Sequence, residues 1–252
     1  MLPITWAIHP RAQLTCYTHA FWLFHVKRRN PMLRSACALL LLIIVSLPNL
    51  VMADQQLSQI LDGLQKTYSQ LPGLSLPYER EVITRSMAML GGGTNKDLAT
   101  GQLYFQPPSS VKIQQETPKP ETMYTEGTVL WYYVPHKNQA YRYPSPEFVQ
   151  LLGDIFRGLR DAEERFDIVL SSVSEDGRCE LNLTPNPPWS GIQHLELTVL
   201  QMDYTIKKVE IYDSAGGITR FILGDLHVEN SFPEDFFRFH VPEGVEVIEE
   251  EG

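Results

Sequence analysis

Cysteine is scarce in this chain, and its positions restrict how the fold can be held together. The 252 residues include three cysteines, Cys16, Cys37 and Cys179. Two of them precede residue 54, where we place the start of the processed chain, so only Cys179 would remain and no internal disulfide could form. The remaining chain of about 200 residues is long enough to be stabilised by burial of apolar surface alone.

Catalytic and metal-binding motifs are also absent. Pro188-Trp189-Ser190-Gly191 lacks the nucleophile-elbow pattern, and Gly91-Gly92-Gly93 is not followed by the Lys-Ser/Thr of a phosphate loop, so we interpret it as a turn. No Cys-x-x-Cys occurs, and the histidines after residue 53 lack the spacing of a helical metal motif: His136, His194, His227 and His240. We therefore expect no catalytic residues, no metal and no cofactor. An enzyme remains an alternative, which loss of an activity on changing His194 or His240 would support.

Basic residues are few after residue 53. The chain has 21 basic and 30 acidic residues, a formal charge of −9. The first 53 residues contain five of the basic residues and no acidic ones, which leaves 16 against 30, a balance of −14. This charge disfavours nucleic acid and anionic membrane surfaces as partners.

A single long apolar run occurs, at Ala36–Leu47, and it is short for a membrane span of about 20 residues. Arg34 precedes it and Val51-Met52-Ala53 follows it, as in a secretory signal. We predict cleavage after Ala53 and export to the periplasm. An uncleaved anchor is the alternative. Cys37 precedes the run, so lipid modification of the protein itself is not expected.

The domain prediction follows from this signal. Met32 is a suitable start, so residues 1–31 are interpreted as a mis-called extension, with a long basic leader as the alternative. Residues 32–53 are the predicted signal peptide and residues 54–252 the functional domain.

The pattern of apolar residues predicts one antiparallel sheet with two helices. Helical spacing covers 54–69, with Asp54 as its cap, and 144–165. Alternating runs bounded by turn residues predict strands at 81–90, 100–106, 111–115, 122–125, 129–134, 166–172, 179–183, 193–201, 205–212, 218–229 and 236–240. The helices are the available cover for one face of the sheet. The pattern alone leaves open whether they close an ordinary core or cover a cavity.

Three ordered segments resemble the LolA family of periplasmic lipoprotein carriers. They are Gly101–Pro108 (GQLYFQPP), Glu126–Pro135 (EGTVLWYYVP) followed by Gln139-Ala140, and Phe237–Val247 (FRFHVPEGVEV). Gly216–Phe221 also lies where the family has a turn and a strand. The resemblance spans essentially all of 54–248. It implies a mainly β (α+β) fold, in which a single curled antiparallel sheet forms an unclosed barrel with an N-terminal helix and a mid-chain helical lid.

The resemblance also implies a lipid-binding site. Val111 and Ile113 match bulky inward residues of a family strand, and Phe105, Trp131 and Tyr133 are candidates for the same cavity lining by alternation. The lid candidates are Phe148, Leu152, Ile155 and Phe156. For each aromatic residue alone, ordinary core packing is an equally good interpretation.

One position departs from the family pattern. Many members have an arginine before the proline of the first segment, where it latches the lid, and this chain has Pro107. The latch is therefore missing or moved, with Arg142 and Arg157 as candidates.

The function implied by the resemblance is that of a monomeric periplasmic chaperone. It would carry acylated lipoproteins from an inner-membrane ATP-driven exporter to an outer-membrane lipoprotein acceptor. The alternative is a protein of the same fold that carries or senses another lipid or glycolipid.

Overall fold

The computed structural model describes residues 48–86, 97–144 and 146–250. The predicted extension 1–31, the signal peptide as far as residue 47 and the Gly91–Gly93 loop lie outside these residues. The described chain from Asn49 onward belongs to one structural unit. In this described part, no helix combines the length and the apolar character that crossing a membrane would require.

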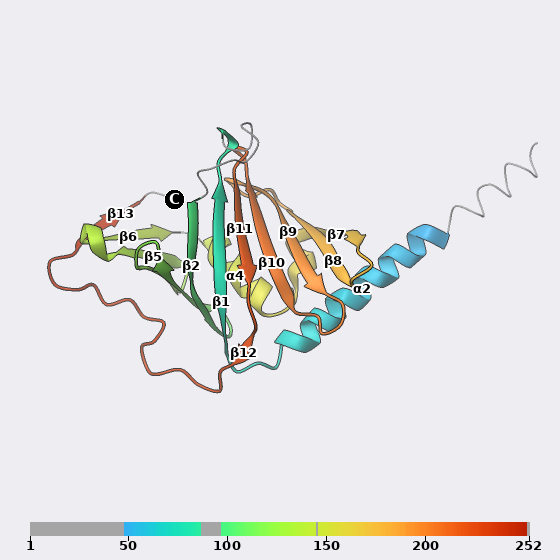
Figure 1. The fold of residues 1–252 in the computed structure, drawn as a ribbon, viewed down its shortest axis with the longest axis horizontal. Coiled ribbons are helices and arrows are strands. Elements are labelled where there is room, and N and C mark those ends of the chain that lie inside the picture. Colours follow the sequence, from blue (N-terminus) through green and yellow to red (C-terminus); the bar gives the residue numbers. More distant parts are fainter. Residues whose placement is uncertain (1–47, 87–96, 145, 251–252) are drawn as a thin grey trace, which may run out of the picture. The chain divides into compact units, whose positions relative to one another are not determined.

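One continuous sheet dominates the unit (Figure 1). Its strand order is β13-β6-β5-β4-β3-β2-β1-β11-β10-β9-β8-β7, with β12 paired to β1 beside β11, and every pairing is antiparallel except that of β13 with β6. The edge strands β7 and β13 do not pair with each other in the described residues, so the barrel is unclosed and the predicted fold class is confirmed. The elements are α2 (Pro48–Tyr68), β1 (Leu74–Ile83), β2 (Asp97–Gln106), β3 (Ser110–Thr117), β4 (Glu121–Glu126), β5 (Val129–Val134), η1 (Pro135–Lys137), β6 (Gln139–Pro144), α4 (Pro146–Phe156), η2 (Ala162–Glu164), β7 (Phe166–Val173), β8 (Arg178–Pro185), β9 (Ile192–Leu200), β10 (Ile206–Asp213), β11 (Ile218–Leu223), β12 (His227–Val228) and β13 (Glu246–Glu249).

The sheet has an inner face, covered by both helices, and an outer face. Paired residues of neighbouring strands share a face and successive residues alternate between faces. Leu103 on β2 pairs with Ile113 on β3, and both lie in the core with α4. Tyr104 and Lys112, which also pair, therefore lie on the outer face.

Helix α2 anchors one end of the inner face. Ile60, Leu64 and Tyr68 lie on one stripe and are at most 3% exposed. The Tyr68 hydroxyl accepts a hydrogen bond from the Ile206 N–H at 3.0 Å, and burial raises the pKa of Tyr68 to about 12. The prediction that Asp54 caps this helix is wrong, because the helix begins at Pro48 and Asp54 is in its interior.

The strand predicted at 81–90 lies earlier than expected. β1 covers Leu74–Ile83, and residues 84–86 are not in a strand. Pro77 obscured this strand in the sequence because proline cannot donate a ladder hydrogen bond. β1 tolerates it because Pro77 faces the gap between β11 and β12, where its carbonyl accepts from the Gly224 N–H at 2.8 Å.

The strand predicted at Phe236–His240 is wrong. This segment belongs to an irregular connection, residues 229–245, which we call the strap; in Figure 1 it is the long red segment between β12 and β13. Its amides form turns instead of a ladder: Phe236 N–H donates to the Pro233 carbonyl at 3.1 Å and Arg238 N–H to the Asp235 carbonyl at 2.9 Å. Asp235 has a φ of +66°, which a strand does not accommodate.

Candidate functional site

An apolar cavity separates α4 from the inner face of the sheet. Its wall carries no polar surface, and its volume is about 30 Å³. Ligand pockets typically enclose roughly 300–1,000 Å³, so the cavity is closed in this structure and could admit a chain only if α4 moved. The wall consists of Leu103, Ile113, Phe148, Leu151, Leu152, Ile155, Phe156, Val209, Ile211, Phe221 and Leu223.

Helix α4 is fixed over the sheet by two close backbone approaches. A Cβ at Gly153 would lie 3.3 Å from the Pro108 carbonyl oxygen, in the turn between β2 and β3. A Cβ at Gly158 would lie 2.3 Å from the Leu64 carbonyl oxygen of α2, and Gly158 has a φ of +73°. Gly153 weakens the helix in isolation, and Gly158 follows its last residue by two positions. Without side chains, both allow this segment to pack closely against its neighbours.

A buried ion cluster holds the same helix. The Asp154 carboxylate is 1% exposed and accepts hydrogen bonds from Arg157 Nη2 at 2.8 Å and from Arg165 Nη2 and Nε at 2.5 and 3.1 Å. Arg165 directly precedes β7, so the pair ties the lid helix to the sheet edge. We call Asp154, Arg157 and Arg165 the lid cluster.

The structure shows the contacts of the two arginines that were candidates for the latch. Arg142 pairs with Glu249 at 2.8 Å, between β6 and β13, and does not contribute to the lid cluster. Arg157 does contribute, from the position that directly follows α4. Asp154 and Arg165 were not predicted as site residues, although an acidic residue inside the apolar stripe Leu151–Ile155 could have pointed to them.

Seven of the nine predicted site residues lie together on the inner side. Ile113 and all four lid candidates, Phe148, Leu152, Ile155 and Phe156, line the cavity. Phe105 packs against Phe156 with ring centroids 5.6 Å apart, and Val111, 1% exposed, belongs to the same core. Six wall residues were not anticipated, five of them from β10, β11 and β2 and one from α4: Val209, Ile211, Phe221, Leu223, Leu103 and Leu151.

Trp131 and Tyr133 do not share this lining. Tyr124 pairs with Trp131 and with Lys112, which places Trp131 on the outer face, and Tyr133 follows by alternation. Their rings pack around Phe239 of the strap at centroid distances of 5.2 and 5.3 Å. The expectation that they line the inner cavity is thus corrected. Successive residues of a strand point to opposite faces, and the register places Trp131 and Tyr133 on the face opposite to Ile113.

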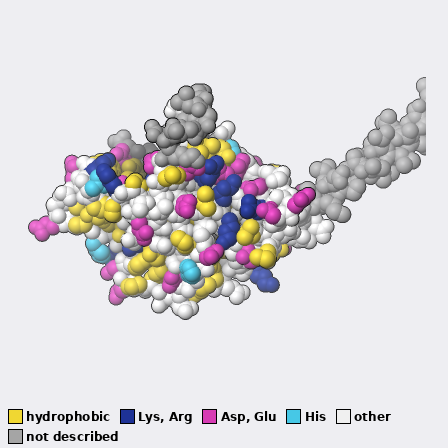
Figure 2. All heavy atoms as spheres, in the orientation of Figure 1, with side chains coloured by type: hydrophobic (Ala, Val, Ile, Leu, Met, Phe, Trp, Pro, Cys, Tyr) yellow, Lys and Arg dark blue, Asp and Glu magenta, His cyan; other side chains and the backbone are white. Residues whose placement is uncertain are grey.

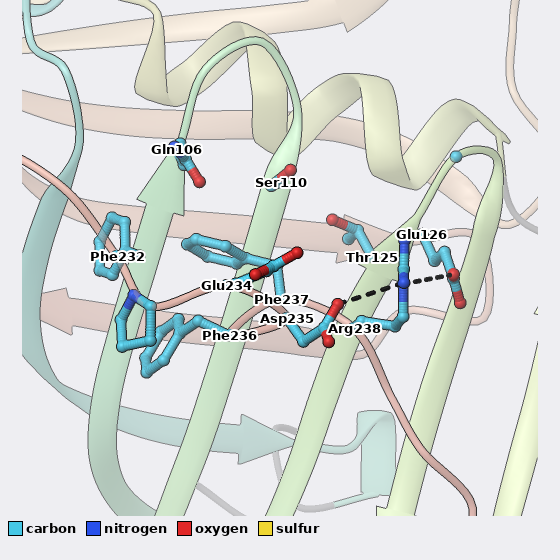
Figure 3. Close-up of a pocket in the computed structure, with 12 residues that line it drawn as sticks. Gln106, Ser110, Thr125, Glu126, Phe232, Glu234, Asp235, Phe236, Phe237 and Arg238 are labelled. Atoms are coloured by element: carbon cyan, nitrogen blue, oxygen red, sulfur yellow. Dashed lines mark ion pairs between the residues drawn. The ribbon is translucent and has the colours of Figure 1, made fainter.

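A larger hollow lies on the outer face, between the strap and strands β2–β4 (Figure 3). It encloses about 410 Å³, but its lining is mostly polar and charged. Arg238 in its centre pairs with Asp235 at 3.1 Å and with Glu126 at 3.8 Å. Asp235 and Glu126 thus share a cationic partner, and the polar lining suits water better than an acyl chain.

Ion pairs also lie on the outer face over β1, β10 and β11. Basic and acidic side chains lie side by side on the face drawn in Figure 2. Arg220 bonds to Glu81 and Glu210 at 2.6 Å each, and His194 stacks on Tyr212 of this same face. No group of three or more potential metal ligands occurs in the residues that the structure describes. The chemistry available at the inner site is therefore apolar binding.

Comparison with known proteins relates this architecture to one family. The family described as outer membrane lipoprotein carrier protein LolA matches residues 88–240, more than half of the chain. An outer-membrane lipoprotein carrier protein of Methylobacillus flagellatus is 23% identical over 192 residues, covering 75% of this chain and 90% of its own length. An outer-membrane lipoprotein carrier protein of Chromohalobacter salexigens is 25% identical over 163 residues, covering 64% of this chain and 76% of its own length. A solved LolA superfamily protein from Nitrosomonas europaea aligns with a TM-score of 0.43 at 16% identity, covering 72% of this chain and 97% of its own.

Proposed function

The chain belongs to the LolA family, and from this premise we propose that it is a periplasmic carrier of acylated lipoproteins. It would take up lipoproteins from an inner-membrane ATP-driven exporter, shield their acyl chains in the cavity beneath α4, and deliver them to an outer-membrane acceptor. The protein acts by binding and release, without catalysis. Export depends on the predicted signal at residues 32–53.

The observation that carries this proposal is the apolar cavity with a separable cover. Each methylene of an acyl chain kept out of water contributes roughly 0.8 kcal/mol, so an apolar site with no polar wall suits such a chain. One wall of the cavity is the sheet and the other is α4, so outward movement of one helix would enlarge it. The closed volume of about 30 Å³ makes that movement a requirement of the proposal.

The test is capture of the natural cargo. The full chain with a C-terminal tag would be expressed in its own host, recovered from the periplasm and examined by mass spectrometry for acylated peptides and free lipids. Acylated lipoproteins in the eluate support the carrier. Lipids without lipoproteins favour the alternative, a carrier or sensor of another lipid or glycolipid. Neither, from folded protein, means that the cavity is an ordinary core.

Substitutions in the cavity wall test whether the captured cargo binds in the cavity. Ile155→Asp places a charge in the wall and should abolish capture, but Ile155 is 1% exposed and the change can also unfold the protein. Phe148→Asp changes a less buried wall residue and serves as the second variant. Val169→Asp, on the outer face and 58% exposed, is the matched control and should retain cargo. Thermal melts establish that each variant is folded.

A further inference from the structure

An arginine adjoins the apolar cavity on the inner face. Arg80 of β1 pairs in register with Phe221 of β11 and Ala99 of β2. Paired residues share a face, and Phe221 is part of the cavity wall. The Arg80 side chain therefore projects from the cavity side of the sheet, next to the wall.

The Arg80 guanidinium has donors that the fold does not use. Its Nε is buried and has no hydrogen-bond partner. Across the described residues, no ion pair or hydrogen bond to this guanidinium occurs. Arg220, its neighbour on the opposite face, differs sharply, because it bonds to the carboxylates of Glu81 and Glu210 at 2.6 Å each. A buried donor without a partner is rare in folded proteins and calls for an explanation.

The groups nearest to this arginine do not neutralise it. Two acidic residues of the described chain lie on the same face near it: Asp97, which pairs in register with Val82, and Glu121. Glu121 accepts hydrogen bonds from the Tyr132 hydroxyl and from Gln115 Nε2, the latter at 3.3 Å. Burial raises the pKa of Tyr78 to about 12, and the charge of Arg80 acts in the opposite direction on it. The positive charge of Arg80 therefore lies close enough to Tyr78 to oppose the rise in its pKa.

The side of the cavity opposite β11 carries aromatic rings with polar tips. Tyr132 stacks on Tyr141 at 6.0 Å and Tyr141 on Tyr143 at 6.3 Å, from β5 and β6, and all three are half-buried. Such rings present apolar area together with hydroxyls. The inner face therefore passes from a fully apolar wall on β10 and β11, past Arg80 on β1, to a half-exposed band of tyrosines on β5 and β6.

We propose that Arg80 anchors the carbonyl end of an acyl chain whose tail lies in the apolar cavity. The guanidinium presents donors in a planar fork that matches the oxygens of a carboxylate, and it can also donate to the carbonyl oxygen of an ester or amide. The ligand chemistry is an acyl oxygen at the end of a long hydrocarbon chain. Its source is either a free fatty acid or the acyl groups of a lipid-modified protein. This inference rests on the proposed acyl-binding function.

The test compares three probes that share a hydrocarbon tail: palmitic acid, its monoglyceride and hexadecane. Binding to the full purified chain would be measured by displacement of a fluorescent fatty acid. Arg80→Met removes the donors and keeps much of the apolar stem. It should weaken palmitic acid binding by about 10- to 100-fold, weaken the monoglyceride by less, and leave hexadecane unchanged. Arg80→Lys should restore part of the palmitic acid affinity, and Arg178→Met, an exposed outer-face arginine, should change nothing.

The outcomes separate this inference from the function on which it rests. If the wild type binds the probes and Arg80→Met leaves the oxygen-bearing ones unchanged, or weakens hexadecane equally, Arg80 is not the anchor although the carrier function stands. If the folded wild type binds none of the probes, the acyl-binding function fails and the inference fails with it. An equal effect on acid and monoglyceride supports lipid acyl groups as the source, and a much larger effect on the acid supports free fatty acid.

Discussion

The lid cluster provides the sharpest quantitative prediction. In Arg165→Gln, the Asp154 carboxylate loses two of its three charged donors and keeps Arg157. A hydrogen bond to a charged group contributes about 1.5–3 kcal/mol, and the Arg165 side chain is 29% exposed, so we expect a loss of about 2 kcal/mol in the stability of the closed lid. This corresponds to a roughly 30-fold increase in the open population.

Hydrogen exchange followed by mass spectrometry measures this opening. Peptides that cover α4 should exchange about 30-fold faster in Arg165→Gln, while peptides of the central strands β1, β2 and β11 should keep their wild-type rates. Local opening and global unfolding are distinguished in this way within one experiment.

The matched control is Arg160→Gln in the same segment. Arg160 pairs with Asp161 at 3.7 Å, and both side chains are more than half exposed, so removing this pair should change exchange by less than about threefold. Unchanged α4 exchange in Arg165→Gln would refute a latching role. Equal acceleration of all peptides would show that the cluster supports the whole fold and not the lid.

Three further predictions concern the core and the outer face. Phe105→Ala should lower the free energy of unfolding by about 3–5 kcal/mol in urea denaturation, whereas Val169→Ala, 58% exposed, should change it by less than about 0.5 kcal/mol; similar values would contradict the assigned burial. Burial would raise the pKa of Glu210, but hydrogen bonds from its two cationic neighbours hold it below its usual 4.5. Its stabilising effect should therefore be full above that value and disappear as the pH falls through the lower folded pKa, and Glu210→Gln should flatten this part of the stability profile. Burial raises the pKa of the Cys179 thiol, which is fully buried, so alkylation of native protein should be slow and should follow unfolding; rapid labelling under native conditions would contradict this.

The spacing of apolar residues predicts those helices and strands whose formation depends on residues close together in the sequence. The stripe of Phe148, Leu152, Ile155 and Phe156 repeats at helical spacing, and the structure places all four on the cavity wall. The strands predicted at 122–125 and 129–134 also occur, as the hairpin of β4 and β5, and Gly127 between them has a φ of +63°.

Features that depend on distant partners were not accessible from the sequence. Trp131 and Tyr133 alternate as any strand residues do, and only the pairing of β3, β4 and β5 assigns them to the outer face. Phe237 and Phe239 alternate with polar residues as in a strand, although the segment is irregular in the structure. The irregular strap depends on turns at Pro233 and Asp235, and on aromatic partners that β2 and β5 contribute.

The parallel pairing of β13 with β6 also affects how the protein is assembled. β6 would otherwise offer a row of unpaired amides and carbonyls, which is a template for association with another chain. The residues that cover it are 107 positions away, as Gln139 and Glu246 show, so they reach β6 after a long loop has closed. Until then the tyrosine-rich strands β5 and β6 have an open edge. The carrier is thus most prone to aggregate in the interval before β13 joins the sheet.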